Sequence, residues 1–181
     1  MIDETDYIRR MIDGETRLFS YFLDRYSRPV YSLIIQLVSN HEDAEELTQD
    51  TFMKAFRKLD TFKYDCSFST WLYRIAYNTA ISATRKKRMV FPALDEAMLG
   101  NIPDETVDAF FENDDEEMLQ KLEKAIDYLN PEEKALITLY YLDEKSVGDV
   151  ASILGLSVDN TKVKLFRVRK KLYGWIKSND V

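Results

Sequence analysis

No lysine or arginine occurs between residues 91 and 118, although ten carboxylates accumulate there. Pro92, Gly100 and Pro103 interrupt the same stretch, and its helical periodicity fades. On either side, apolar residues recur every three to four positions over long distances, which is the period of amphipathic helices. The sequence therefore predicts two small helical domains, 1–90 and 119–181, joined by an acidic flexible linker, 91–118.

Composition places the whole chain in the all-α class. Its 181 residues include only 5 glycines and 4 prolines, and 45% are hydrophobic, which is enough to bury real cores and excludes disorder throughout. The single cysteine, Cys66, cannot form an internal disulfide, and with one histidine, His41, no ordinary His/Cys metal site exists. We expect no cofactor, and we expect Cys66 to be inert rather than redox-active.

Nothing in the sequence predicts insertion into a membrane. The most apolar stretch, around 30–38, is interrupted by Ser32 and Gln36 and is too short to cross a bilayer. The acidic N-terminus does not resemble a signal peptide. We therefore expect a soluble cytoplasmic protein.

Charge is distributed unevenly along the chain. The net charge of -7 comes from the middle segment, since residues 1–90 carry +1, 91–118 carry -10 and 119–181 carry +2. Exposed charges are screened beyond roughly 10 Å, so the acidic linker need not cancel basic patches on the flanking domains. The linker is either a self-repelling connector or a mimic of nucleic acid, and the sequence alone does not separate the two.

Four helices are expected to share the first core: Asp3–Asp24, Pro29–Ser39, Glu42–Leu59 and one from Phe68 to Arg88. The third follows Ser39 and Asn40, which are both good N-caps. One of its sides is apolar, and the opposite side carries Asp43, Glu46, Gln49, Asp50 and Met53. Such a side is usually just a solvated face, but it could also bind a basic partner.

The helix from Phe68 combines aromatic rings with a basic end. Trp71, Asn78 and the run 85–88 supply a ring, an amide and cations, which are the groups that bind single-stranded nucleic acid. The alternative is structural: Trp71, Tyr73 and Tyr77 would be core aromatics, and the basic run a solvated helix end.

The C-terminal part has the layout of a helix-turn-helix. After a helix over about 119–129, Asn130-Pro131-Glu132-Glu133 is a strong helix start. Ser146 begins a short helix that ends at Gly155, and Ser157 begins a last helix that extends to about Trp175. On that last helix Lys162, Val163, Phe166 and Arg167 point away from the packing side and could enter a major groove.

Four blocks in order carry a resemblance to a known family: residues 43–52, residues 68–78, Leu129-Asn130-Pro131 and the helix-turn-helix. Together they resemble an extracytoplasmic-function (ECF) sigma factor of the sigma-70 family over nearly the whole chain. Ser82, Gly148, Asn160 and Thr161 depart from the commoner family residues, which bears on promoter preference. The resemblance implies sigma region two in 1–90 and sigma region four in 119–181.

The resemblance also assigns partners. Core RNA polymerase would be bound through its β′ clamp and β flap, promoter DNA would be recognised at two elements, and an anti-sigma factor, often at the membrane, would regulate the protein. The surface for the β′ clamp would comprise Asp43, Glu46, Gln49, Asp50 and Met53.

Two DNA-reading surfaces follow from the same resemblance. The minus ten element would be read and melted by Lys63, Tyr64, Phe68, Trp71, Arg74, Asn78, Arg85, Lys86 and Arg88. The minus thirty-five element would be read as a duplex by Asn160, Lys162, Val163, Lys164, Phe166, Arg167 and Lys170. Such a protein performs no covalent chemistry, because polymerase makes the bonds.

Three other readings remain. A conventional helix-turn-helix regulator would need a dimerisation or sensing domain, which the first half does not suggest. A helical enzyme would need paired carboxylates, with Glu45 and Glu46 or the group 114–117 as candidates, but adjacent helical residues point to different faces. A polymerase-binding inhibitor would explain the acidic helix and leave both nucleic-acid faces without a purpose.

Overall fold

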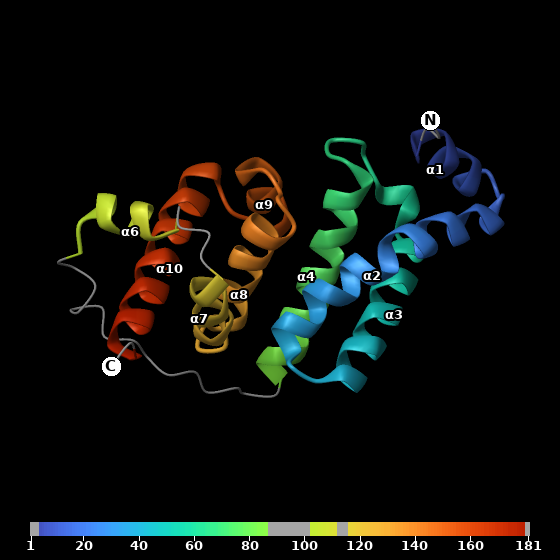
Figure 1. Ribbon diagram of the computed structural model, residues 1–181. Helices are drawn as coiled ribbons and strands as arrows, with labels where there is room; N and C mark the ends of the chain where they lie inside the picture. Colours follow the sequence, from blue (N-terminus) through green and yellow to red (C-terminus); the bar gives the residue numbers. More distant parts are fainter. Residues whose placement is uncertain (1–3, 87–101, 112–115, 180–181) are drawn as a thin grey trace.

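The computed structural model describes residues 4–86, 102–111 and 116–179, and every regular element among them is helical. The predicted all-α class is therefore confirmed. The first helices and the last helices form two groups that lie side by side, with the N-terminus at one end and the C-terminal helix toward the other (Figure 1).

The first group contains α1 (Glu4–Ile12), α2 (Phe19–Val38), α3 (His41–Arg57) and α4 (Phe68–Lys86), with short 3₁₀ turns η1 (Thr16–Leu18) and η2 (Leu59–Thr61). Helices α2, α3 and α4 pack against one another around fully buried side chains that include Phe22, Leu33, Ile34, Leu37 and Leu72. Asn40 caps α3 as expected, since its side chain accepts a hydrogen bond from the backbone N–H of Asp43 at 2.9 Å.

The first two predicted helices have different bounds in the structure. The expected helix over residues 3–24 breaks after Ile12, where Gly14 adopts a φ of 110° that other residues rarely reach. The expected start at Pro29 is wrong, because α2 continues through this proline from Phe19 to Val38. Burial on both sides of it, at Phe22 and Val30, outweighs the one backbone hydrogen bond that proline removes.

The second group contains α6 (Asp104–Phe111), α7 (Glu116–Ile126), α8 (Pro131–Ile137), the π-helical turn η3 (Thr138–Leu142), α9 (Val147–Leu154) and α10 (Val158–Asn179). The predicted helix boundaries are confirmed at three places. Asn130 and Glu133 form a reciprocal capping box, and Ser146 caps α9. Gly155 ends α9 in the left-handed region at φ 69°.

Helix α6 lies inside the segment predicted to be a linker without helices. Val107, Phe110 and Phe111 recur at the helical spacing and follow Pro103, whose carbonyl accepts the N–H groups of Thr106 and Val107. This short apolar stripe was the signal that the sequence reasoning missed. Residues 116–118, also assigned to the linker, form the start of α7, and 91–101 and 112–115 lie outside the described residues.

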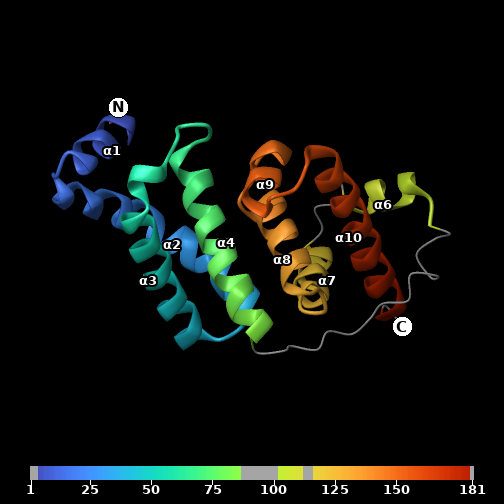
Figure 2. The same ribbon diagram turned by 180° about the vertical axis from the view of Figure 1, so that it is seen from behind.

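The two groups are in contact, because α4 packs against α9 and α8 while α2 packs against α8. A view from behind shows the same order, with α4 next to α8 and α9, and α10 beyond them (Figure 2). The helix-turn-helix thus lies against the helix that carries the aromatic and basic residues.

Candidate polymerase and nucleic-acid interfaces

The predicted acidic face is presented by α3. Glu46, Gln49, Asp50 and Met53 are exposed, and Asp43, in the first turn, is half-buried. Met53 exposes 52% of its surface and adds an adaptable apolar contact to this face. Asp50 lies 3.9 Å from Lys54 one turn later, a weak exposed pair that leaves the carboxylate accessible. The structure therefore brings these five residues together on one side of one helix.

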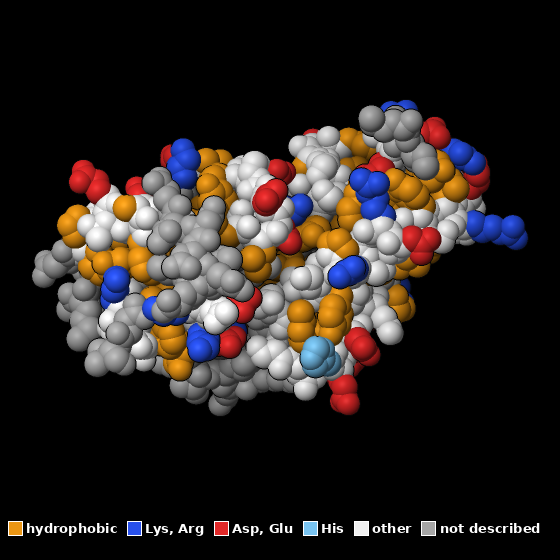
Figure 3. Space-filling view, viewed as in Figure 1, with side chains coloured by type: hydrophobic (Ala, Val, Ile, Leu, Met, Phe, Trp, Pro, Cys, Tyr) orange, Lys and Arg blue, Asp and Glu red, His pale blue; other side chains and the backbone are white. Residues whose placement is uncertain are grey.

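An apolar groove adjoins this face between α2 and α3. It has a volume of about 830 Å³, and Phe19, Leu23 and Phe56 line it together with Gln49 and Met53. Leu23 and Phe56 expose 37% and 41% of their surfaces. Figure 3 shows hydrophobic side chains at the surface over α1 and α2, with charged side chains around them. Sequence reasoning did not select Phe19 or Leu23, because the expected helix over residues 3–24 was assigned only to the shared core, without a face of its own.

The loop before α4 presents a small aromatic cluster. Phe62 lies buried at its centre, with ring centroids 4.7 Å from Tyr64 and 5.4 Å from Trp71. Tyr64 has a φ of 61° and is 43% exposed, and Lys63 beside it is exposed too. The cluster offers the faces and edges of aromatic rings to solvent at the start of α4, which suits the stacking of an unpaired base.

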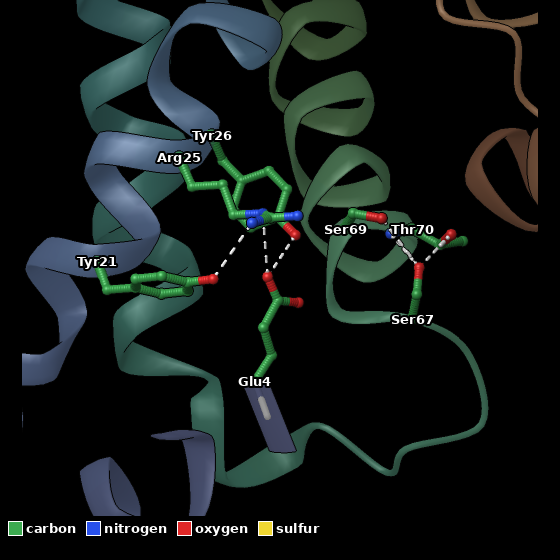
Figure 4. Close-up of polar contacts among 7 residues, drawn as sticks. All are labelled: Glu4, Tyr21, Arg25, Tyr26, Ser67, Ser69 and Thr70. Carbon is green, nitrogen blue, oxygen red and sulfur yellow. Dashed lines mark hydrogen bonds and ion pairs between the residues drawn. The ribbon is translucent and has the colours of Figure 1, made fainter. Parts of the chain in front are cut away.

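Ser67 caps the start of α4. Its hydroxyl accepts a hydrogen bond from the backbone N–H of Thr70 at 3.1 Å and also lies 2.9 Å from the hydroxyls of Ser69 and Thr70 (Figure 4). The cap fixes the angle at which the chain leaves the loop and enters the helix.

One predicted member of this surface lies in the core. Phe68 is only 4% exposed and packs against Phe22 with ring centroids 4.4 Å apart. The centroid of the Phe68 ring lies 5.7 Å from that of Trp71. Because Phe68 is buried, its ring is not available to a base in this structure. Helical periodicity already places Phe68 on the packing side of α4, together with Leu72.

The exposed side of α4 carries Arg74, Asn78, Ser82 and Arg85. The Asn78 amide donates to the carbonyl of Arg74 at 2.8 Å, which leaves its side-chain oxygen free to accept. Arg85 pairs with Glu132 at 3.1 Å, across from the second group of helices. Lys86 ends α4, and Arg88 lies outside the described residues.

On α10, a packing side and an exposed side are clearly separated. Thr161, Leu165 and Val168 are buried, as the period predicted. Asn160, Lys162, Val163 and Arg167 are exposed, and Lys164, Phe166 and Lys170 are half-buried. Val163 exposes 48% of its surface among these cations, which is the mixture of apolar and basic groups that a major groove accepts.

The predicted faces of α4 and α10 border one groove. Its volume is about 970 Å³, and residues from α4, α8 and α10 line it. From α4 come Asn78, Ser82 and Arg85, and from α10 come Lys162, Val163, Phe166, Arg167 and Lys170. The two candidate DNA-reading faces therefore line opposite sides of the same groove.

Polar contacts hold α4 against the helix-turn-helix. The Thr70 hydroxyl donates to Asp149 at 2.9 Å, and the Lys145 ammonium lies 4.3 Å from the centre of the Tyr73 ring. Burial raises the pKa of Tyr73 above its usual value, and burial likewise raises the pKa of Asp143, which shares a hydrogen bond with the Tyr73 hydroxyl. These contacts join residues seventy or more positions apart.

Three further features of the described residues concern metal binding, membrane spanning and the single cysteine. No group of three or more metal-ligating side chains lies together in them, and none of their helices is long and apolar enough to span a membrane. Burial raises the pKa of the Cys66 thiol, which disfavours the reactive thiolate.

Comparison with known proteins agrees with this geometry. Residues 22–89 match the Sigma-70 region 2 family, and residues 119–172 match the Sigma-70 region 4 family. The ECF RNA polymerase sigma-E factor of Escherichia coli is 30% identical over 172 residues, which cover 91% of this chain and 90% of that protein. This chain belongs to the ECF sigma factor family. It is an alternative sigma factor, and the reading as a conventional regulator is not favoured.

Further relatives of this sigma factor agree. The Bacillus subtilis factor SigW is 28% identical over 179 residues, covering 91% of this chain and 92% of the relative. The sigma factor RpoE of Bartonella quintana, solved in complex with the anti-sigma factor NepR, has a TM-score of 0.63 at 25% identity, covering 90% of this chain and 98% of that one. CnrH, solved with the cytosolic domain of CnrY, shares the fold with a TM-score of 0.67 at 24% identity, covering 96% of each chain.

Proposed function

We propose that this sigma factor binds core RNA polymerase through α3, reads and melts the minus ten element with the loop 62–67 and α4, and reads the minus thirty-five element with α10. The observation that carries the proposal is the separation of three chemically different exposed faces on these three elements. An acidic face with an apolar groove suits a protein partner, an aromatic and amide face suits unpaired bases, and a basic helix suits a duplex.

In this proposal region two spans residues 1–90, the linker 91–118 and region four 119–181. The family matches begin and end inside these outer ranges. Region two would engage the β′ clamp and region four the β flap.

The clamp surface is proposed to combine charge with apolar contact. Glu46 and Asp50 would pair with basic side chains of the β′ clamp, and Met53 would lie at the border of the groove that contains Leu23 and Phe56. Apolar area supplies affinity, while the carboxylates supply orientation and rate of association. This combination explains why exposed apolar side chains stand beside carboxylates on this side of the molecule.

Strand separation is proposed to draw its free energy from several contacts at once. Unpairing and flipping a base costs about a few kcal/mol. Stacking on an aromatic ring such as Trp71 returns about 1–3 kcal/mol per base, so base capture and phosphate contacts must act together. The protein makes and breaks no covalent bond in this scheme, and it acts in the cytoplasm, where polymerase meets the chromosome.

An anti-sigma factor is the proposed regulator. The RpoE relative was solved with such a partner, and the matching fold covers nearly all of that chain. A partner that stabilises the packed arrangement of α4 and α9 would keep the two DNA-reading faces turned toward each other.

Paired variants test the assignment of faces. Asp50→Arg should weaken binding to purified core polymerase by about tenfold or more, because it places like charges together. Asn78→Ala should leave core binding intact and lower promoter opening by about tenfold, since one base contact is lost.

Matched controls accompany both variants. Glu123→Arg changes an exposed charge on α7 by the same amount and should not alter core binding. Asn179→Ala removes an exposed amide that makes the same bond to the carbonyl four residues earlier, at the end of α10, and should not alter promoter opening. Unchanged core affinity in Asp50→Arg would refute the clamp surface, and equal loss of core binding and opening in Asn78→Ala would refute the base-reading role.

A further inference from the structure

Helix α6 lies along α10 on the side away from α4 (Figures 1 and 2). Asp104 and Asp108, one helical turn apart, both reach cations of α10. The Asp104 carboxylate lies 3.0 Å from the Lys170 ammonium, and the Asp108 carboxylate lies 2.7 Å from the Arg169 guanidinium. Two carboxylates one turn apart on α6 therefore pair with two consecutive cations of α10.

Apolar contacts reinforce these pairs. Val107 is completely buried, and the Phe110 ring meets Tyr173 edge to face with centroids 4.9 Å apart. The Arg169 guanidinium also lies 5.1 Å from the centre of the Phe111 ring. Lys170 and Arg169 are left only 16% and 21% exposed, whereas their carboxylate partners remain more than half exposed. The cations are thus largely withdrawn from solvent by α6.

The helical form of α6 depends on this docking. A helix of eight residues is marginal by itself, because the first turn costs more conformational entropy than its hydrogen bonds return. Helix α6 is therefore stabilised by the ion pairs and the buried side chains that join it to α10. A molecule that competes for these cations would favour unfolding of α6.

Lys170 belongs to the face proposed to read the minus thirty-five element. Its ammonium lies 4.5 Å from the centre of the Phe166 ring, one turn earlier on α10. Arginine and lysine side chains on such a helix are the usual ligands of DNA phosphates. Carboxylates spaced along α6 offer these cations the same kind of anionic partner, already tethered to the chain.

We infer that α6 is an internal competitor of promoter DNA for the basic side of α10, so that it must leave Arg169 and Lys170 before that side can contact DNA phosphates. The inference rests on the proposed role of α10 in duplex recognition. The linker segment then limits DNA binding by the free protein, and DNA binding in turn displaces α6.

The test measures binding of the full-length protein to a fluorescent random-sequence DNA duplex by anisotropy, at low and at physiological salt. Asp104→Asn combined with Asp108→Asn should raise affinity about two- to tenfold at low salt, as expected for two ion pairs whose carboxylates remain exposed. The plot of log affinity against log salt should steepen by up to about 1.8, because two more cations contact phosphates.

A matched control separates release of α6 from simple loss of negative charge. Glu105→Gln combined with Glu123→Gln removes the same charge from exposed positions that make no ion pair in the described part of the chain. If this control raises affinity and salt slope as much as the Asp104 and Asp108 pair does, the inference is overturned.

A second variant leaves charge unchanged. Phe110→Ala should loosen α6 and raise DNA affinity, whereas Thr106→Ala, at an exposed position of the same helix, should not.

Hydrogen exchange adds a direct readout, since amides of 104–111 should exchange faster when the duplex is added to wild-type protein. Unchanged or slower exchange would contradict displacement.

Arg167→Ala distinguishes failure of this inference from failure of the proposed function, because Asp104 and Asp108 pair with Lys170 and Arg169 rather than with Arg167. If Arg167→Ala weakens duplex binding while the α6 variants bind as wild type does, α10 still reads DNA and α6 does not compete. If Arg167→Ala binds as tightly as wild type, the proposed face of α10 is wrong, and the inference that depends on it fails as well.

Discussion

The side chain of Asn78 on α4 is oriented by a hydrogen bond before any base binds. Its amide nitrogen is already committed to the Arg74 carbonyl at 2.8 Å, so the side chain is held in one orientation. Asn78 lines the groove, and a side chain that is already held in place loses less rotamer entropy when it binds. Periodicity alone predicted that Asn78 is exposed; the hydrogen bond that orients it required the structure.

A hydrogen bond between Tyr26 and Glu4 joins α1 to α2. The Tyr26 hydroxyl donates to the Glu4 carboxylate at 2.8 Å, and Arg25 lies 3.2 Å from the same carboxylate (Figure 4). Burial, and next the bond to Glu4, raise the pKa of Tyr26 to about 12. The neutral tyrosine is thus the form that the fold favours.

A pH dependence follows from that raised pKa. The stabilisation from Tyr26 is fully present below its unfolded pKa of about 10 and is lost as pH rises through about 12. Tyr26→Phe should therefore lose less stability than wild type between pH 9 and pH 11, measured by urea unfolding. The other buried tyrosines are the same in both proteins, so an identical pH dependence would show that Tyr26 is not coupled to folding.

At the scale of elements, helix ends were the most predictable features. Asn40, Asn130 and Ser146 were each expected to begin a helix, and each side chain accepts a hydrogen bond from a backbone N–H in the next turn. Such signals are local and depend on residues only three positions apart. They can be recognised without knowing what the helix packs against.

Elements that depend on distant contacts were not predictable in this way. Pro29 suggested a helix start, but α2 continues through it, because its apolar face is buried on both sides of the proline. Helix α6 was assigned to a linker, because its stripe of Val107, Phe110 and Phe111 is short and surrounded by carboxylates. Its partners on α10 lie about sixty residues further along the chain.

Two glycines of the helix-turn-helix should respond in opposite directions to alanine. Gly155 has a φ of 69° and open space around an added Cβ, so Gly155→Ala should cost about 1–2 kcal/mol from backbone strain alone. Gly148 lies in the first turn of α9 with ordinary contact at 3.7 Å, so Gly148→Ala should stabilise by up to about 1 kcal/mol. Urea unfolding of both variants measures the pair, and changes of the same sign would contradict the account of the turn.

At the scale of the whole molecule, the packing of α4 against α9 decides which faces are accessible. Thr70 and Asp149 meet at 2.9 Å across this contact, and Arg85 of α4 meets Glu132 of α8 at 3.1 Å. Neither pair could be predicted from periodicity, because each partner lies in a different predicted domain. The sequence indicated which faces could bind DNA, and the structure adds that they are turned toward each other.

Removing the Thr70 hydroxyl should shift the molecule toward an open arrangement. Thr70→Val keeps the shape of the side chain and deprives Asp149 of a donor, a loss of about 1.5–3 kcal/mol for a hydrogen bond to a charged group. Small-angle X-ray scattering should then give a larger radius of gyration. Ser69→Ala, which removes the neighbouring hydroxyl, serves as control. A radius unchanged from wild type would show that this contact does not hold the two groups together.

The central claim is that the chain directs polymerase to promoters with two separate readers. The most direct measurement is in vitro transcription with purified bacterial core polymerase, this protein and a library of genomic fragments, scored for start sites that require the protein. We expect defined starts that share two upstream elements at a fixed spacing, with initiation about tenfold weaker in Asn78→Ala. Binding to core polymerase without any defined start would contradict the claim and favour an inhibitor of polymerase instead.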